Sequence, residues 1–273
     1  MKVNNPNSGR CWVFKNLAIE IWDKIVSSHK VGIEPGEDGI TRDLMAAIRQ
    51  FHSQNRIGLD VYVKPGYNEN VYGSDMDLFV EVAHNQYVWY ALQAKILKRN
   101  GRYDTFRDGH RVNNPTYQWE KLNHLKSLVG CEGFFLLYNG KDDYEFNGTD
   151  ICNRKFNKKQ FGCSILALSY AETLALKTSN YGRYNNPTFE DIHPRYAEPW
   201  RVLVCCNEYV RGLTRYSLET ILEANRITDY NKIEFGPVGG IGTGPIDSTN
   251  EIVNSINKAD WNADYRMIVK LEV

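Results

Sequence analysis

Residues 73–97 read GSDMDLFVEVAHNQYVWYALQAKIL and predict a β-hairpin that carries polar groups at one end of an otherwise apolar pair of strands. DLFVEV and YVWYALQAKIL have the β-branched and aromatic content of buried strands, and a short polar turn separates them. Asp75 and Asp77 stand at the start of the first run, whereas Gln93 and Lys95 lie near the end of the second. Burying such groups costs free energy unless they pair or bind something. This end of the hairpin is therefore the first candidate for a site.

The register of the hairpin decides which of these groups meet. If the turn is centred near residue 85, antiparallel partners sum to about 170, which places Asp77 opposite Gln93. Lys95 has the same parity as Gln93, so both side chains point to one face. A one-residue slip would scatter the cluster. A salt bridge that trims the end of a sheet explains Asp77 and Lys95 equally well at this stage.

Composition excludes several classes of protein. The chain has 273 residues and a formal net charge of zero, so any binding of a polyanion must come from a local patch. No window holds about 18 consecutive apolar residues, so no membrane span is expected. The first residues contain no apolar signal core, and none of the six cysteines forms a C-x-x-C pair. A cytoplasmic protein with reduced thiols is expected.

Hydrophobic periodicity predicts the order of elements around the hairpin. The N-terminal half is expected to contain helices at residues 12–28 and after an N-cap at Thr41, strands at 57–65, 77–82 and 87–97, a helix after Pro115, and a strand at 133–140. Weaker signals in the second half predict helices at 164–176 and 217–225 and strands at 200–206 and 265–273. We divide the chain into a core at 1–140 and an extension at 141–273, packed on the core and allowed to be continuous with it.

A basic and aromatic loop follows the hairpin. Its cations Lys98, Arg99, Arg102 and Arg111 are candidates for contacts with phosphates. Tyr103 and Phe106 in the same loop can either stack on bases or anchor the loop in the core.

Asp77, followed after a hairpin by Gln93-Ala94-Lys95, resembles the PD-(D/E)XK nuclease superfamily when it occurs in this order of elements. The triplet with Gln in its first position is similar to that of the Mrr-like branch. Glu37, near the start of the first core helix, matches a Glu that many members use. The segments QAKIL, GRYDTF and FFLLYNG are also similar to an uncharacterised family of bacterial nuclease-like proteins linked to phage defence. The resemblance covers residues 34–140.

The resemblance implies an α/β protein with a restriction-endonuclease-like mixed central sheet, an α-β-β-β-α-β core and an α+β C-terminal extension. It implies a metal-dependent endonuclease that hydrolyses DNA, with RNA as a second possibility. Mg²⁺ or Mn²⁺ would be held by Asp77, Gln93 and Glu37, with help from the backbone carbonyl of Ala94. Lys95 would orient the attacking water and stabilise the transition state. Lys98, Arg99, Arg102 and Arg111 would contact the nucleic acid.

The same resemblance sets expectations about partners. Many relatives cut both strands as dimers, so a homodimer or a partner protein of a prokaryotic defence system is expected. Association with a membrane is not expected. Because Gln93 replaces an acid, the site has one negative charge fewer than the usual motif.

Two other interpretations stay open. The Gln93 triplet and the neutral charge favour a nuclease-fold protein without catalysis that binds nucleic acid or a partner. A small-molecule hydrolase that uses Glu37 and Asp77 is a more distant alternative, because it has no evident need for Lys95. Further candidates for metal-proximal roles are Asp60, Asp75, Glu81 and Gln118.

Overall fold

The computed structural model describes residues 8–55, 59–63, 73–107, 110–111, 114–146, 148, 156–177, 186–205, 210, 212–224, 231–232 and 265–271. The first half contains α1 (Ser8–Lys30), α2 (Glu37–Asn55), β1 (Leu59–Val63), β2 (Met76–Ala83), β3 (Gln86–Ile96), β4 (His110–Arg111), β5 (Asn114–Pro115), α3 (Gln118–Val129) and β6 (Glu132–Tyr138). The second half adds η1 (Lys158–Gly162), β7 (Cys163–Ala167), α4 (Leu168–Ala175), α5 (Phe189–Ile192), β8 (Ala197–Pro199), α6 (Val202–Cys205), α7 (Leu218–Ala224), β9 (Asn231–Lys232) and β10 (Tyr265–Val269). The expected order α-β-β-β-α-β is confirmed as α2, β1, β2, β3, α3 and β6.

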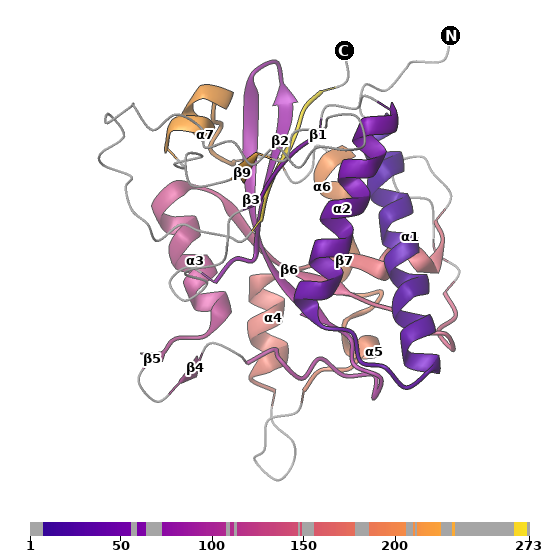
Figure 1. The fold of residues 1–273 in the computed structure, drawn as a ribbon. Coiled ribbons are helices and arrows are strands. Elements are labelled where there is room, and N and C mark those ends of the chain that lie inside the picture. Colours follow the sequence, from indigo (N-terminus) through magenta and orange to yellow (C-terminus); the bar gives the residue numbers. More distant parts are fainter. Residues whose placement is uncertain are drawn as a thin grey trace.

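A mixed sheet forms the centre of the molecule (Figure 1). Its strand order is β8-β7-β6-β3-β2-β10-β1-β9, in which the six inner strands have five or more residues and the two edge strands have three and two. The β3–β6 and β10–β2 pairs are parallel, and the other pairs are antiparallel. The α/β class with a mixed central sheet is therefore confirmed. Strands from both halves of the chain belong to this one sheet.

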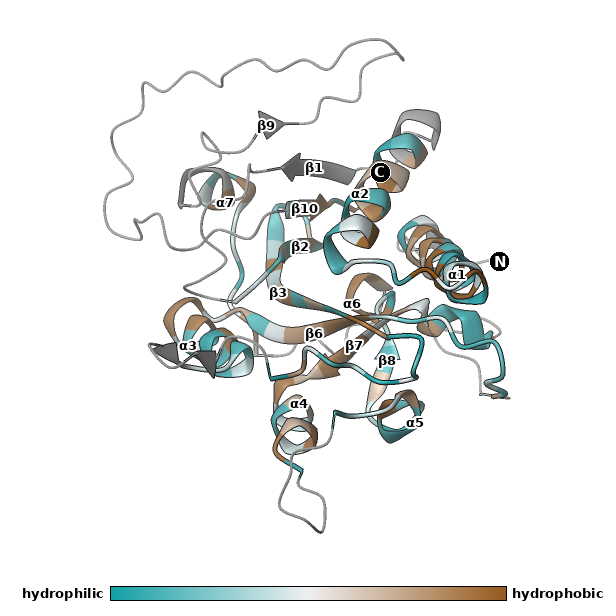
Figure 2. Cartoon of the chain, turned by 60° about the horizontal axis from the view of Figure 1, so that its bottom comes forward, coloured by the Kyte–Doolittle hydropathy of each residue, from teal (hydrophilic) through white to brown (hydrophobic). Residues whose placement is uncertain are grey.

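Helices cover both faces of the sheet (Figure 2). One face packs against α1, α2 and α6 through even-numbered residues such as Leu78, Leu92 and Leu136. The other packs against α3, α4 and α5 through odd-numbered residues such as Phe79 and Phe135. Because β3 is buried on both faces, its sequence is a continuous apolar run and not an alternating one. Gln93 and Lys95 are odd-numbered and belong to the second face.

The register of the hairpin differs from the one expected from sequence. Asp77 pairs with Ala91, so facing residues sum to 168 along most of the hairpin. The cause is a tight turn at His84 and Asn85, where Asn85 adopts a φ of 52°, together with a bulge between Glu81 and Ala83. The shift of two residues keeps every side chain on its expected face but moves the strands relative to each other. Gln93 therefore lies beside Asp75 and not opposite Asp77.

The start of α2 also differs from expectation. The helix begins at Glu37, directly after Pro35 and Gly36, and Thr41 lies inside it. Thr41 donates a side-chain hydrogen bond to the carbonyl of Glu37 and also contacts the hydroxyl of Tyr138. The interpretation of Thr41 as an N-cap is wrong. An acidic residue in the first helical turn is favoured by the helix dipole, which accounts for Glu37 at this position.

Two segments of the second half have a different secondary structure from the predicted one. Residues 164–176 were expected to be helical, but the segment divides into β7 and α4. Residues 200–206 were expected to be a strand, but Val202–Cys205 is the short helix α6. Short apolar runs cannot be assigned by periodicity alone. Here the edge strand β8 ends at Pro199, and Trp200 then turns away from the sheet to donate a hydrogen bond to the carbonyl of Phe14 in α1.

The C-terminal strand occupies an unexpected place in the sheet. The strand predicted at 265–273 is confirmed as β10, but it lies between β1 and β2. Tyr265–Val269 pair in parallel with Met76–Val80 and antiparallel with Leu59–Val63. The first two strands of the core are therefore joined through β10.

Candidate functional site

Four polar side chains meet just before the first residue of β2, where β3 continues past the end of its partner. They are Glu37, Asp75, Gln93 and Lys95. Asp75 immediately precedes β2, and one of its carboxylate oxygens accepts hydrogen bonds from the side-chain amide of Gln93 and from the backbone N–H of Ala94, the latter at 2.7 Å. Asp75 thus occupies the position that sequence reasoning assigned to Asp77.

Glu37 reaches the same strand from the first turn of α2. Its Oε1 accepts hydrogen bonds from the backbone N–H of Ile96 at 3.2 Å and from the hydroxyl of Thr105 at 2.9 Å. Its Oε2 lies 3.8 Å from the amine of Lys95. Glu37 is about a quarter exposed, so one end of this pair contacts solvent. Thr105 gave no signal in the sequence because its partner is 68 residues away.

The two carboxylates line one edge of β3. The N–H groups of Ala94 and Ile96 point to the side on which β2 would continue, and Asp75 and Glu37 occupy that side instead. These two N–H groups are about 6.6 Å apart along the strand. In an antiparallel ladder the C=O of a residue points to the same side as its N–H. The carbonyl oxygen of Ala94 is therefore directed to the space between the two carboxylates.

Lys95 is buried to an unusual degree. Its residue is 1% exposed, and its amine lies 5.9 Å from the centre of the Phe135 ring. The carboxylate of Glu37 is beyond hydrogen-bonding distance, at 3.8 Å. A buried ammonium group is costly unless it is paired and hydrogen-bonded. The structure thus holds a cation next to a carboxylate without forming a short ion pair.

Asp77 does not belong to this cluster, and the expected convergence of Asp77 with Gln93 and Lys95 is wrong. Its partner Ala91 is four residues from Lys95, which is about 13 Å along the strand. The Asp77 carboxylate is 1% exposed and accepts hydrogen bonds from Trp89 at 3.0 Å and from Arg266 of β10 at 3.2 Å. Burial raises the pKa of Asp77, although Arg266 and Trp89 favour its ionised form.

The other acidic and amide candidates are distributed as follows. Glu81 accepts hydrogen bonds from the backbone N–H groups of Asn85 and Leu271, so it ties the hairpin to the chain after β10. Gln118 begins α3 with its backbone close to Gly73, and its buried Oε1 lacks a hydrogen-bond partner within the described part of the chain. The side chain of Asp60 lies outside the described residues.

The basic loop follows the site directly. Lys98 is half-buried and Arg99 is exposed, and both line surface hollows. Arg102 lines neither of these two hollows and donates a hydrogen bond to the carbonyl of Asn186. The side chain of Arg111 lies outside the described residues. Tyr103 and Phe106 are fully buried and serve as core anchors, so their alternative role in base stacking is wrong.

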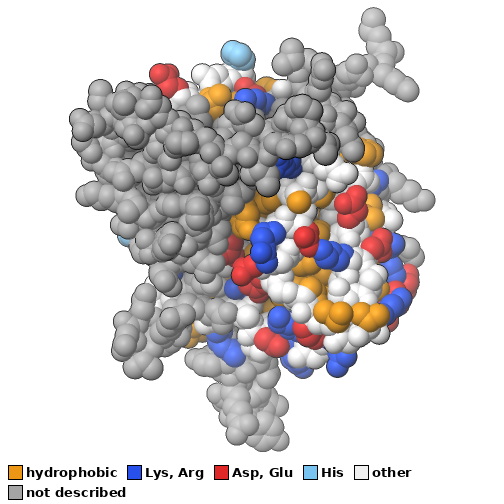
Figure 3. Space-filling view, viewed as in Figure 1, with side chains coloured by type: hydrophobic (Ala, Val, Ile, Leu, Met, Phe, Trp, Pro, Cys, Tyr) orange, Lys and Arg blue, Asp and Glu red, His pale blue; other side chains and the backbone are white. Residues whose placement is uncertain are grey.

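Charges on the surface are mixed. Figure 3 shows basic and acidic side chains interspersed over the part of the surface formed by α1 and α2. Within the described residues, no group of three or more His, Cys, Asp or Glu is placed to hold a metal ion. No helix among them is long and apolar enough to cross a membrane.

Comparison with known proteins gives one match. The model of a family of unknown function, DUF6615, matches residues 10–265. The chain belongs to this family. The match spans both halves of the sheet, from α1 to the first residue of β10, so the DUF6615 family comprises the extension as well as the hairpin. No curated protein and no solved structure matches the chain.

Proposed function

We propose that this DUF6615 protein is a metal-dependent endonuclease that hydrolyses phosphodiester bonds in DNA. The observation that supports this most is the meeting of Glu37, Asp75, Gln93 and Lys95 at one end of β3. Carboxylates, an amide and an amine serve phosphodiester hydrolysis because the reaction needs a cation held by oxygen ligands and a positive group near the phosphate.

The order of elements supports the same proposal. The hairpin lies between β1 and α3 in the chain and β6 follows α3, which is the α-β-β-β-α-β order that the resemblance implies. The motif is then Asp75, Gln93-Ala94-Lys95 and Glu37, with Asp75 in place of Asp77. The insertion of β10 between β1 and β2 is a departure from the order expected from the resemblance.

The donor set fits a hard divalent cation. Asp75 and Glu37 offer carboxylate oxygens, Gln93 offers an amide oxygen, and the carbonyl of Ala94 is directed between the carboxylates. Mg²⁺ binds oxygen ligands, usually with one or two protein carboxylates and several waters, so a site with two carboxylates suffices. A cation bound there would lower the pKa of a water and polarise the phosphate.

The side chains of the protein have separable roles in this proposal. Lys95 contributes positive charge that stabilises the charge growing on the phosphate oxygens. Its burial against Phe135 keeps the amine in a low-dielectric environment, where this interaction is stronger than in water. Thr105 holds the carboxylate of Glu37, and the side-chain amide of Gln93 holds that of Asp75.

Plasmid cleavage in Mg²⁺ or Mn²⁺, with an EDTA control, tests this function. We expect Lys95→Ala, Asp75→Ala and Glu37→Ala each to lower the cleavage rate by about 10²–10³, as removal of a single electrostatic stabiliser does. Lys126→Ala is the matched control, because it removes an exposed lysine whose partner Glu132 lies beside Tyr90, five residues before Lys95 on β3. Equal cleavage by the Lys95→Ala variant and the parent would exclude the proposed mechanism.

Gln93→Glu provides a test in the opposite direction. The change restores a third carboxylate, so we expect tighter binding of Mn²⁺ in calorimetric titration than in the parent. Weaker or unchanged binding would show that residue 93 does not face the cation.

A second function has one observation in its favour. Asp75 and Glu37 each accept a backbone N–H of β3, which gives both carboxylates a role in capping the strand edge. If Asp75 and Glu37 only cap the edge of β3, the protein would bind nucleic acid or a partner protein without catalysing a reaction. Absence of detectable Mn²⁺ binding to the parent would favour this alternative.

The biological setting rests on the resemblance. We infer a role in prokaryotic defence from it. Because the chain has no net charge, loading onto nucleic acid would need a dimer or a partner protein. Size measurement with and without a DNA duplex tests whether a dimer forms on the substrate.

A further inference from the structure

A hollow of about 380 Å³ lies at the carboxyl ends of β3 and β6, next to the candidate site. Its floor contains Val26 of α1 and Leu97, the residue after β3, and the loop after β6 contributes Gly140. Ligands of α/β proteins commonly bind beyond the carboxyl ends of the strands. Sites for small ligands measure about 300–1,000 Å³ and combine apolar walls with a few polar groups. The hollow has the volume of such a site and a largely polar and charged lining, with Val26 and Leu97 as its apolar part.

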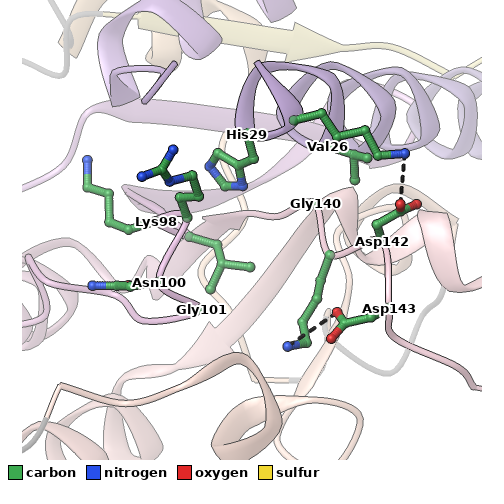
Figure 4. A pocket seen from close by; sticks show the side chains of 12 residues that line it. Val26, His29, Lys98, Asn100, Gly101, Gly140, Asp142 and Asp143 are labelled. Atoms are coloured by element: carbon green, nitrogen blue, oxygen red, sulfur yellow. Dashed lines mark ion pairs between the residues drawn. The ribbon is translucent and has the colours of Figure 1, made fainter. Parts of the chain in front are cut away.

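The two sides of the hollow differ in charge (Figure 4). On one side stand Lys98 and Arg99, and neither forms an ion pair with another described residue. On the other side Lys30 pairs with Asp142 at 2.7 Å, and Lys141 pairs with Asp143 at 3.4 Å. One side therefore offers two cations that form no ion pair with any described residue, and the other offers carboxylates that already accept hydrogen bonds from lysines.

The backbone beneath Lys98 and Arg99 is fixed. The N–H of Lys98 donates to the carbonyl of Arg102, and the N–H of Gly101 donates back to the carbonyl of Lys98. The N–H of Arg99 donates to both carboxylate oxygens of Glu34, at 3.1 and 3.3 Å. A cation pair on a fixed turn loses less conformational entropy when it binds an anion.

A second hollow connects this place with the candidate site. It measures about 530 Å³ and shares Lys98, Arg99 and Asn100 with the first. Its other lining residues are Glu34 and Asp104. Asp104 is adjacent to Thr105, which contacts Glu37, and Glu34 lies three residues before Glu37. The two hollows thus extend from the neighbourhood of Glu37 past the cation pair to the ends of β3 and β6.

From this arrangement we propose that the hollow at the ends of β3 and β6 binds one nucleotide unit of the substrate strand, with its phosphate on Lys98 and Arg99. This inference rests on the proposed function, because it takes the strand that crosses Lys95 to be a nucleic acid. The apolar floor of Val26 and Leu97 accommodates the sugar and base. Asp142 and Asp143 accept hydrogen bonds from the ring N–H or hydroxyl groups of the unit.

The position relative to Lys95 supports a neighbouring nucleotide. Lys98 follows Lys95 by three residues, which is about 10 Å of extended chain. This spacing allows one phosphate at Lys95 and an adjacent one at Lys98. A hollow that holds a single nucleotide also requires the strand to leave its duplex at this point, so the favoured substrate has a single-stranded end, gap or flap.

Calorimetric titration with deoxythymidine 5′-monophosphate, without divalent metal, tests the hollow separately from cleavage. We expect the nucleotide to bind at least tenfold more tightly than either deoxythymidine or inorganic phosphate. A variant with both Lys98→Ala and Arg99→Ala should bind it at least tenfold more weakly than the parent. The control Lys126→Ala removes an exposed lysine that does not line the hollow, and it should bind the nucleotide as tightly as the parent does.

The outcomes separate this inference from the proposed function. If the nucleotide binds as expected but the protein cuts no DNA with any metal, the proposed nuclease function is wrong. The hollow would then bind a nucleotide that is not part of a substrate strand. Metal-dependent cleavage that depends on Lys95, combined with no nucleotide binding or an unchanged KM in the Lys98→Ala and Arg99→Ala variant, would reject the hollow and leave the nuclease standing. Equal affinity for inorganic phosphate and the nucleotide would also reject it, because only an anion would then be recognised.

Discussion

Asp75 accepts a hydrogen bond from the side-chain amide of Gln93 across the end of the β2–β3 hairpin. This contact fixes the amide plane of Gln93 and holds the carboxylate of Asp75 against the edge of β3. Asp75, which precedes β2, therefore belongs to the candidate site, whereas Asp77, inside β2, has a structural role.

Asp77→Asn should destabilise the protein strongly. The change leaves the guanidinium of Arg266, which is fully buried, without its carboxylate. Removal of one partner of a buried ion pair costs about 3–5 kcal/mol. Urea denaturation measures the loss, with Glu132→Gln as the control because it breaks the exposed pair with Lys126 and should cost under about 1 kcal/mol. A loss in Asp77→Asn no larger than in this control would contradict the structural role.

Lys95→Met should stabilise the protein while it lowers the cleavage rate by about 10²–10³. Methionine keeps the unbranched stem against Phe135 and removes a buried charge whose carboxylate lies 3.8 Å away. We expect a gain of about 1–2 kcal/mol in the free energy of unfolding, measured without divalent metal. The control Lys126→Met alters an exposed residue and should change stability little. A less stable Lys95→Met variant would show that the amine is an ordinary structural cation.

His193 should make the protein less stable in acid. It is buried, and burial lowers its pKa to about 3 while a hydrogen bond with the carbonyl of Phe189 opposes the shift. The unfolded chain, with a His pKa of about 6.5, then binds a proton that the folded protein does not bind. Stability from this group is complete above about pH 6.5 and is lost as the pH falls toward 3, by a few kcal/mol. His193→Gln should flatten this dependence in thermal unfolding, whereas His84→Gln in the exposed hairpin turn should preserve it.

Replacing Gly162 or Gly39 by alanine should change the free energy of unfolding in opposite directions. At Gly162 a Cβ would lie 2.7 Å from the backbone nitrogen of Trp22, so α1 would have to move off η1. Such overpacking costs about 1–3 kcal/mol. At Gly39, inside α2, a Cβ would meet nothing within 4 Å, and alanine should add about 0.5–1 kcal/mol through helix propensity. Thermal unfolding of both variants distinguishes the effects, and a destabilised Gly39→Ala variant would contradict the packing described around α2.

Sequence was sufficient for the elements with strong local patterns. The helices α1 and α3, the hairpin and the buried strand β6 follow from periodicity and turn residues, and they carry Gln93 and Lys95 to one face. The register of the hairpin could not be predicted, because no residue pattern in the sequence indicates the bulge between Glu81 and Ala83. Its effect was to exchange the roles of Asp75 and Asp77.

Long-range pairing explains most of the remaining differences. Arg266 lies 189 residues from Asp77, and Thr105 lies 68 residues from Glu37, so no local pattern connects either pair. The apolar run that became β7 and α4 is equally compatible with one helix, and only its neighbours in the sheet decide between the two.

The location of β10 has a consequence for the independence of the two halves of the chain. Arg266 lies 189 residues from Asp77 in the sequence, yet Tyr265–Val269 separate β1 from β2 and bring Arg266 to Asp77. A fragment limited to residues 1–140 would therefore leave one edge of β2 unpaired and Asp77 buried without its cation. The hairpin that carries Asp77, Gln93 and Lys95 needs the second half of the chain to complete its sheet.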